Sequence, residues 1–102
     1  MQIEHKHPFT HDEAKARVKA LADYLANRHG MNIAWSGDDS FHLTGKYTVV
    51  SLDVTVQVAP DRINVTGPDP GLLLRGPAKS YIARKVSEYL SPAAALDTLP
   101  RG

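Results

Sequence analysis

The stretch VSLDVTVQV, residues 50–58, decides the fold. Valine and leucine alternate along it with serine, aspartate, threonine and glutamine, so apolar and polar side chains point to opposite sides of an extended chain. A period of two is typical of a strand with one buried face and one face in water. We therefore expect this strand to belong to a sheet that is covered on one face.

Further strands lie on both sides of this stretch. After it, residues 59–62 have the composition of a turn. Ile63 and Val65 then point the same way on a last strand, which the sequence GPDPG at 67–71 ends. Before it, apolar residues alternate over 31–35 (MNIAW), and the sequence GDDS at 37–40 supplies a turn.

The strand after that turn begins at Phe41, and Gly45-Lys46 fit either a second turn or a bulge. Trp35 and Phe41 share the parity of the inward residues on their strands. Large aromatic side chains dominate burial in small domains, so we expect both in the core.

The N-terminal part predicts a short strand and a long helix. Residues Gln2 to Lys6 form the strand. Thr10 and Glu13 then have the spacing of a capping box, in which their side chains satisfy free backbone N–H groups at the start of a helix. Gly30, after two basic residues, ends that helix. The apolar stripe of the helix consists of Ala14, Val18, Leu21 and Leu25.

A second helix and a tail complete the chain. Pro77 can occupy the first turn of this helix, which ends near Ser91-Pro92. We expect residues 1–91 to form one domain and residues 92–102 to be a loosely ordered tail, with at most one extra helical turn within 93–99. The apolar positions of the second helix are Ile82, Val86, Tyr89 and Leu90.

The expected order is β-α-β-β-β-β-α, and the four later strands are joined by connections that suit only antiparallel neighbours. This order predicts an α+β fold, a mostly antiparallel twisted sheet with two helices packed on one face. The other face is expected to be exposed unless a partner covers it. It would carry Thr48, Asp53, Thr55, Gln57, Arg62 and Asn64.

Composition limits the possible functions. The chain has 102 residues, 42% of them hydrophobic, and a formal net charge of +1, which fits one folded domain without a strong field for nucleic acid or anionic lipid. It has no cysteine, which fits a reducing compartment. No apolar run has signal-peptide length or approaches the ~20 residues of a membrane span, so we expect a cytoplasmic protein.

Histidine is the residue type to examine for metal binding. His5 and His7 share one face of the first strand, and His11 follows beyond Pro8. A His-x-His pair is weak evidence, because a site needs a third or fourth ligand at fixed geometry. These three residues are the candidate ligands, but we expect them to be solvated or locally bonded, and we expect no metal.

The sequence contains no set of residues with the pattern of a catalytic site. Asp38 and Asp39 beside Ser40 and His42 could be imagined as a carboxylate pair or as a nucleophile with its base. Adjacent carboxylates are ordinary turn chemistry, however, and nothing supplies an oxyanion hole. The segment 67–71 lacks the lysine and hydroxyl of a phosphate loop. We expect a protein that is not an enzyme and needs no cofactor.

Two surfaces could meet a partner. The basic residues of the two helices could bind RNA or ribosomes, but acidic residues interleave with them, which favours a solvated face. Leu72, Leu73 and Leu74 cannot all face one way, so one of them could be exposed at a hydrophobic contact surface. The basic residues are Lys15, Arg17, Lys19, Arg28, Lys79, Arg84 and Lys85.

An ordered set of positions resembles the putative polyhydroxyalkanoic acid system protein family, also called the polyhydroxyalkanoate granule-associated region family. The similarity extends from about Ile3 to Leu90, and most of its positions are caps, core residues and turns. The positions are Ile3, His7, DEAKARV at 12–18, Leu25, WSGD at 35–38, Phe41, Val54, Val56 and Val58.

The resemblance implies a non-catalytic cytoplasmic protein of polyester-storing bacteria, which binds storage granules or granule proteins through an apolar surface such as Leu72 to Leu74. An alternative is a small-ligand-binding or homo-oligomeric module that uses the exposed sheet face or an unpaired edge strand. An RNA-associated or ribosome-associated protein is the third hypothesis.

Overall fold

The element order of the protein matches the sequence prediction. A computed structural model describes residues 1–47, 49–68 and 75–102. Its elements follow in the order β-α-β-β-β-β-α and end with a short 3-10 helix. They are β1 (Gln2–Lys6), α1 (His11–His29), β2 (Asn32–Trp35), β3 (Ser40–Tyr47), β4 (Val50–Val58), β5 (Arg62–Thr66), α2 (Arg75–Tyr89) and η1 (Leu96–Thr98).

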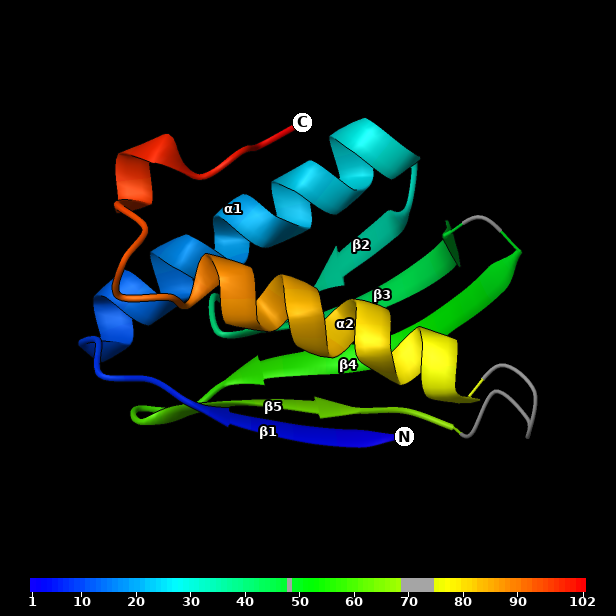
Figure 1. Ribbon diagram of the computed structural model, residues 1–102, viewed down its shortest axis with the longest axis horizontal. Coiled ribbons are helices and arrows are strands. Elements are labelled where there is room, and N and C mark those ends of the chain that lie inside the picture. Colours follow the sequence, from blue (N-terminus) through cyan, green and yellow to red (C-terminus); the bar gives the residue numbers. More distant parts are fainter. Residues whose placement is uncertain (48, 69–74) are drawn as a thin grey trace.

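The five strands form one antiparallel sheet in the order β1-β5-β4-β3-β2. The strands β2 to β5 form a meander, and β1 pairs with β5, so the first strand and the second strand lie at opposite edges. Both helices cross the same face of the sheet (Figure 1). The α+β class and the covered face are therefore confirmed.

Local sequence explains where α1 begins and ends. The Oγ1 atom of Thr10 accepts a hydrogen bond from the backbone N–H of Glu13 at 3.2 Å. This bond satisfies one of the free donors of the first turn. At the other end Gly30 has φ 66°, and its N–H donates to the carbonyl of Ala26 at 3.0 Å. Glycine adopts this left-handed conformation without the clash of a Cβ atom.

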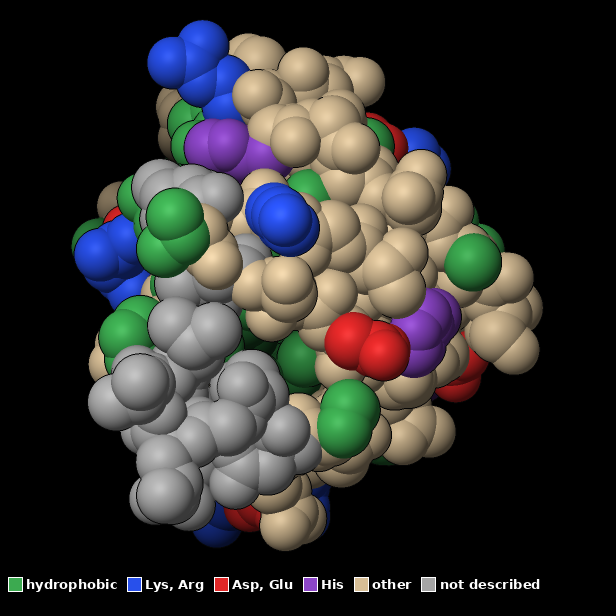
Figure 2. Space-filling model, turned by 90° about the vertical axis from the view of Figure 1, so that its right-hand side faces the viewer, with side chains coloured by type: hydrophobic (Ala, Val, Ile, Leu, Met, Phe, Trp, Pro, Cys, Tyr) green, Lys and Arg blue, Asp and Glu red, His purple; other side chains and the backbone are tan. Residues whose placement is uncertain are grey.

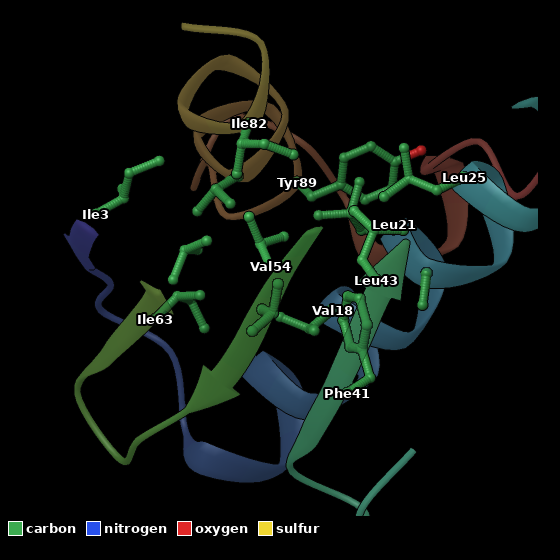
Figure 3. Packing of buried hydrophobic residues seen from close by; sticks show 14 of the residues in the cluster. Ile3, Val18, Leu21, Leu25, Phe41, Leu43, Val54, Ile63, Ile82 and Tyr89 are labelled. Carbon is green, nitrogen blue, oxygen red and sulfur yellow. The ribbon is translucent and has the colours of Figure 1, made fainter. Parts of the chain in front are cut away.

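The core lies between the two helices and the covered face of the sheet. Val18 and Leu21 of α1, Val54 of β4 and Ile82 and Tyr89 of α2 are each at most 3% exposed and converge on one layer (Figure 3). Full burial of one such aliphatic side chain stabilises the fold by about 1.5–3 kcal/mol. The whole predicted stripe of α1 and all four predicted positions of α2 belong to this core.

Neither of the two alternatives expected at Gly45-Lys46, a turn or a bulge, occurs. Strand β3 continues through both residues, with Gly45 opposite Leu52 and Lys46 opposite Ser51. A Cβ atom on Gly45 would lie 2.9 Å from Cγ of Met31, so glycine is needed here for close packing against the start of β2. Sequence alone suggested a turn because glycine has both uses.

Arg17 is a buried link between α1 and the C-terminal segment, not part of a basic surface. Its side chain is 3% exposed. The guanidinium donates to the carbonyls of Tyr89, Ser91 and Ala94 at 2.7–3.2 Å and to Oε2 of Glu13 at 2.9 Å. The planar donor group fits several oxygen acceptors at once, which a lysine could not do.

The residues beyond α2 fold back along α1. Leu99 is 8% exposed, and Nδ2 of Asn27 donates to the carbonyl of Arg101 at 2.8 Å. The hydroxyl of Tyr89 donates to the carbonyl of Pro100. The extra turn that the sequence allows within 93–99 occurs as η1. How loosely residues 92–102 are held stays a prediction.

Candidate functional site

A hollow of about 370 Å³ lies between α1 and the edge strand β2. Three parts of the chain line it: the N-terminal half of α1, the end of β2 and the turn that follows β2. Since β2 is an edge strand, no further strand of the described residues closes this side of the sheet. The lining residues are Lys15, Ala16, Lys19, Trp35, Gly37 and Asp38.

Trp35 forms the aromatic wall of the hollow. The expectation that it belongs to the core is wrong, because 39% of its surface is exposed, whereas Phe41, directly opposite on β3, is 1% exposed. Both rings do lie on the helix side of the sheet, as the alternation of residues predicted, and their centroids are 5.0 Å apart. Trp35 remains exposed because it ends an edge strand with nothing packed beyond it.

An ion pair holds the turn against α1. Nζ of Lys15 lies 2.9 Å from Oδ2 of Asp38 and 3.5 Å from Oδ1 of Asp12. The hydrogen bond from Lys15 lowers the pKa of Asp38 below its usual value and raises the pKa of Lys15. Gly37 has φ 75°, which lets the chain turn sharply just before Asp38. Together these features fix the position of the turn beside Trp35.

The hollow suits apolar contact better than chemistry on a substrate. It offers an indole face, the methyl group of Ala16 and the aliphatic stems of two lysines. The charge of Lys15 is matched by Asp38, and Nζ of Lys19 lies 3.4 Å from Asp23. The lining residues that the structure describes include no histidine and no hydroxyl group, so a nucleophile with its base is not present there.

A polar cluster occupies the middle of the open sheet face. Nε2 of His42 lies 2.8 Å from Oδ1 of Asp53, and Nδ1 lies 3.1 Å from Oγ1 of Thr55. A carboxylate, an imidazole and a hydroxyl in this order resemble the relay of hydrolases. Asp53 and Thr55 were expected on this face, but His42 was not predicted as their partner, because the β3–β4 register decides the contact.

This cluster lacks the other parts of a catalytic centre. The side chains of His42 and Asp53 are 48% and 57% exposed, so water reaches both. The backbone N–H groups of His42 and Thr55 belong to the sheet ladder and are not free to stabilise an oxyanion. The carboxylate imagined as a partner of His42, Asp38, binds Lys15 instead. The cluster can order water on the sheet face.

Two of the three candidate metal ligands, His7 and His11, form local hydrogen bonds. Nδ1 of His7 accepts from the N–H of Phe9 at 3.2 Å, so its Nε2 carries the hydrogen and faces the carbonyl of Ala59 at 3.4 Å. Nε2 of His11 lies 3.0 Å from the carbonyl of Val58. His5 lies on β1. Within residues 1–47, 49–68 and 75–102, no three histidine or acidic side chains are grouped to hold a metal ion.

An aromatic cluster at the other end of α1 was not predicted, because its members come from three separate elements. The rings of Tyr47 and Tyr81 stack with centroids 3.8 Å apart, and His29 lies edge-on to Tyr24 and Tyr47 at 5.4 Å each. Tyr81 is 4% exposed, and its hydroxyl has no hydrogen-bond partner among the described residues. Burial raises the pKa of Tyr81 to about 12.

Two of the segments that carry the family resemblance meet at the hollow. Lys15 and Ala16 belong to the first segment, residues 12–18, and Trp35, Gly37 and Asp38 belong to the second, residues 35–38. A family model described as "Putative polyhydroxyalkanoic acid system protein" matches residues 1–93. The chain belongs to this family. No curated protein and no solved structure matches it.

The match to the polyhydroxyalkanoic acid system family confirms the resemblance found in the sequence, and it includes every element from β1 to α2. Both segments at the hollow lie within it. The match ends before η1, so the link between the tail and α1 lies partly outside the family region. Family membership by itself supports the common fold more strongly than any one contact surface.

The remaining partner surfaces differ in how far the structure describes them. Leu72, Leu73 and Leu74 lie outside the described residues, and their role stays a prediction. On the face shown in Figure 2, hydrophobic side chains of the described residues are scattered among backbone and charged groups. Among the basic residues, Arg17 is buried and Lys85 lies 3.3 Å from Glu88. Neither helix, where described, is long and apolar enough to cross a bilayer.

Proposed function

We propose that the protein is a non-catalytic accessory protein of bacterial polyhydroxyalkanoate storage. It acts in the cytoplasm by binding the surface of the polyester granules or the proteins on that surface. One observation carries the proposal: two of the segments in the family resemblance come together around an exposed tryptophan at the hollow. A role in the polyhydroxyalkanoic acid system is what the family description supplies.

The chemistry of a polyester fits the hollow. A polyhydroxyalkanoate presents alkyl groups and ester carbonyls, which need apolar contact and hydrogen-bond donors. The indole ring of Trp35 supplies a large apolar surface and one N–H donor, and Lys19 supplies an ammonium group at the rim. Burial of apolar area contributes about 25 cal/mol per Å², so one exposed indole is a useful anchor for a surface of this kind.

The local chemistry supports binding over catalysis. In the lining of the hollow Lys15 lies beside the carboxylate of Asp38, and their opposite charges neutralise each other. The histidine cluster with Asp53 and Thr55 lies on the opposite face of the sheet from the helices and is open to water. The proposal therefore assigns the apolar contact to Trp35 and assigns no reaction to either place.

Sedimentation with polyester particles tests the proposal. The purified protein should pellet with the particles, and Trp35→Ala should reduce its affinity about tenfold, which corresponds to about 1.4 kcal/mol. Val49→Ser is the matched control, because Val49 is also apolar and 79% exposed but lies away from the hollow. Circular dichroism should show that both variants remain folded.

The leucines are tested separately. Replacing Leu72, Leu73 and Leu74 together by serine should weaken sedimentation if they add a second contact, and combining this change with Trp35→Ala should then abolish it. Failure of the wild-type protein to bind either the particles or isolated granule proteins, under conditions where a known granule binder does, would refute the proposed function.

A further inference from the structure

The two edges of the sheet differ in charge. The edge strand β1 carries Glu4 and Lys6, which are exposed. The edge strand β2 has the sequence NIAW and carries no charge. Ile33 is half-buried and Trp35 is exposed, both on the helix side. Charged residues on an edge strand discourage pairing with another chain, so β2 is the edge that is open to pairing.

At this edge the backbone of β2 presents N–H and C=O groups that do not bond to β3. The N–H of Ser36 donates to the carbonyl of Ser40 at 2.9 Å. Because hydrogen-bonding direction alternates along an antiparallel strand, Ala34 and Asn32 also face β3. The N–H and C=O groups of Ile33 and Trp35 therefore point away from the sheet. Each copy offers two donors and two acceptors in a row.

We propose that two copies of the chain pair through β2 about a two-fold axis at Ala34. In this antiparallel register Ile33 of each copy lies opposite Trp35 of the other. The four free N–H groups then meet the four free carbonyls. Ile33 and Trp35 also share one face of the sheet, so the pairing joins a β-branched and an aromatic side chain twice. Two copies of Ala34, a small residue, meet on the open face.

Neighbouring registers fit less well. A shift by one residue would place Ile33 opposite Ala34, whose side chain points to the other face of the sheet. A register centred on Ile33 would place Trp35 opposite Met31, whose N–H already donates to the carbonyl of Leu25 at 3.3 Å. Of these three registers, the one centred on Ala34 satisfies every free group of Ile33 and Trp35.

The pairing has a consequence for granule binding, and this part rests on the proposed function. A two-fold axis perpendicular to the sheet keeps the helices of both copies on the same side. Both hollows then face one way, so a dimer could contact one polyester surface at two places. Two linked contacts hold a surface more tightly than one. The pairing itself does not depend on this use.

A cysteine cross-link tests the register directly, because the chain has no cysteine of its own. In this register the two Ala34 residues form a non-hydrogen-bonded pair with Cα atoms about 4.5 Å apart, a separation that a disulfide can span. Oxidised Ala34→Cys should run as a covalent dimer. Ser87→Cys is exposed on α2 and serves as the control that should stay monomeric. Equal cross-linking of the two variants would overturn the proposal.

Proline substitutions at the two edges test the free hydrogen bonds. Ile33→Pro removes an N–H that only the dimer uses, and it should weaken dimerisation in sedimentation equilibrium at least about tenfold. Gln2→Pro is the matched control on β1, where main-chain bonds of Met1 and His7 show that the Gln2 N–H faces outward. It should leave dimerisation unchanged. A monomeric wild-type protein, or an unchanged Ile33→Pro dimer, would overturn the pairing.

Ala34→Lys separates this inference from the proposed function. It should give a monomer, because two ammonium groups would meet at the axis, while Trp35 and the hollow remain intact. A monomeric Ala34→Lys protein that still binds polyester particles fits both proposals. A wild-type dimer that ignores the particles would overturn granule binding alone, whereas an Ala34→Lys protein that remains dimeric would overturn the pairing alone.

Discussion

Arg17 shows how one buried cation organises distant parts of the chain. Its guanidinium contacts Glu13 on one side and three carbonyls of residues 89–94 on the other, and it lies 4.0 Å above the ring of Phe9. The carbonyls would lose their partner if the side chain were shortened. A buried acceptor without a donor is costly, so the contact is worth more than a surface ion pair.

Arg17→Leu should lower the free energy of unfolding by about 2–4 kcal/mol, measured by urea denaturation. It should also speed amide hydrogen exchange in residues 92–102, because the tail loses its attachment to α1. Lys19→Ala, which removes an exposed pair with Asp23, should change stability by less than about 0.5 kcal/mol. A loss in Arg17→Leu no larger than that of the control would contradict this assignment.

Two tyrosines predict how stability depends on alkaline pH. Burial raises the pKa of Tyr81 and of Tyr89 from 10.0 to about 12. A raised pKa means that the folded state favours the neutral phenol. Stability is therefore fully present below about pH 10 and falls as the pH rises from 10 to 12. Unfolding and phenolate absorbance should change together over this interval.

Phenylalanine substitutions separate the two hydroxyl groups. Tyr81→Phe should change stability at neutral pH by less than about 0.5 kcal/mol, since its hydroxyl has no described partner, and it should reduce the alkaline loss. Tyr89→Phe loses the bond to Pro100 and should cost about 1 kcal/mol at neutral pH. A larger loss in Tyr81→Phe than in Tyr89→Phe at neutral pH would be inconsistent with these contacts.

At the scale of elements, glycine is favourable in one place and unfavourable in another: close packing requires it at Gly45 in β3, whereas it weakens the helix at Gly76 in α2. A Cβ atom on Gly45 would come within 2.9–3.2 Å of three atoms of Met31, whereas nothing lies within 4 Å of a Cβ atom on Gly76 in α2. Gly45→Ala should therefore destabilise the protein by about 1–3 kcal/mol. Gly76→Ala should stabilise it by up to about 1 kcal/mol through helix propensity. Thermal unfolding of the two variants should move in opposite directions, and equal shifts would contradict the assignment.

The elements were predictable where the signal was local. The stop at Gly30 and the alternation of residues 50–58 depend on neighbouring residues and appear as predicted. The cap at Thr10 also forms, but the carboxylate of Glu13 bonds to Arg17 instead of closing the predicted capping box. Strand order depends on contacts between distant segments. The pairing of β1 with β5 is of this kind, and nothing in the local pattern of residues 2–6 specifies it. The turn predicted at Gly45 was wrong for the same reason, since Met31 explains that glycine.

At the scale of the whole molecule, the candidate site could be predicted only in pieces. The sequence marked residues 12–18 and 35–38 as related to one family, but it assigned them to caps, core and turns. The exposure of Trp35 follows from the position of β2 at the edge of the sheet, which parity cannot give. His42 and its two partners likewise needed the register of β3 and β4. Composition could not reveal either arrangement.

The edge strand connects the two proposals at this scale. One side of the β2 region offers free backbone groups to a second copy, and the hollow above it offers an apolar surface to a granule. Trp35 takes part in both, so its substitution alone cannot separate them, whereas Ala34→Lys changes only the axis of pairing. The variants at positions 34 and 35 therefore have to be compared in the same binding experiment.

The most direct measurement is a binding isotherm on washed polyhydroxyalkanoate particles for the wild-type protein, Trp35→Ala and Val49→Ser. Saturable wild-type binding is the predicted result, with half-saturation at about tenfold higher concentration for Trp35→Ala and no change for Val49→Ser. Indistinguishable isotherms for the wild type and a folded Trp35→Ala protein would contradict the claim that the hollow at Trp35 is the contact surface.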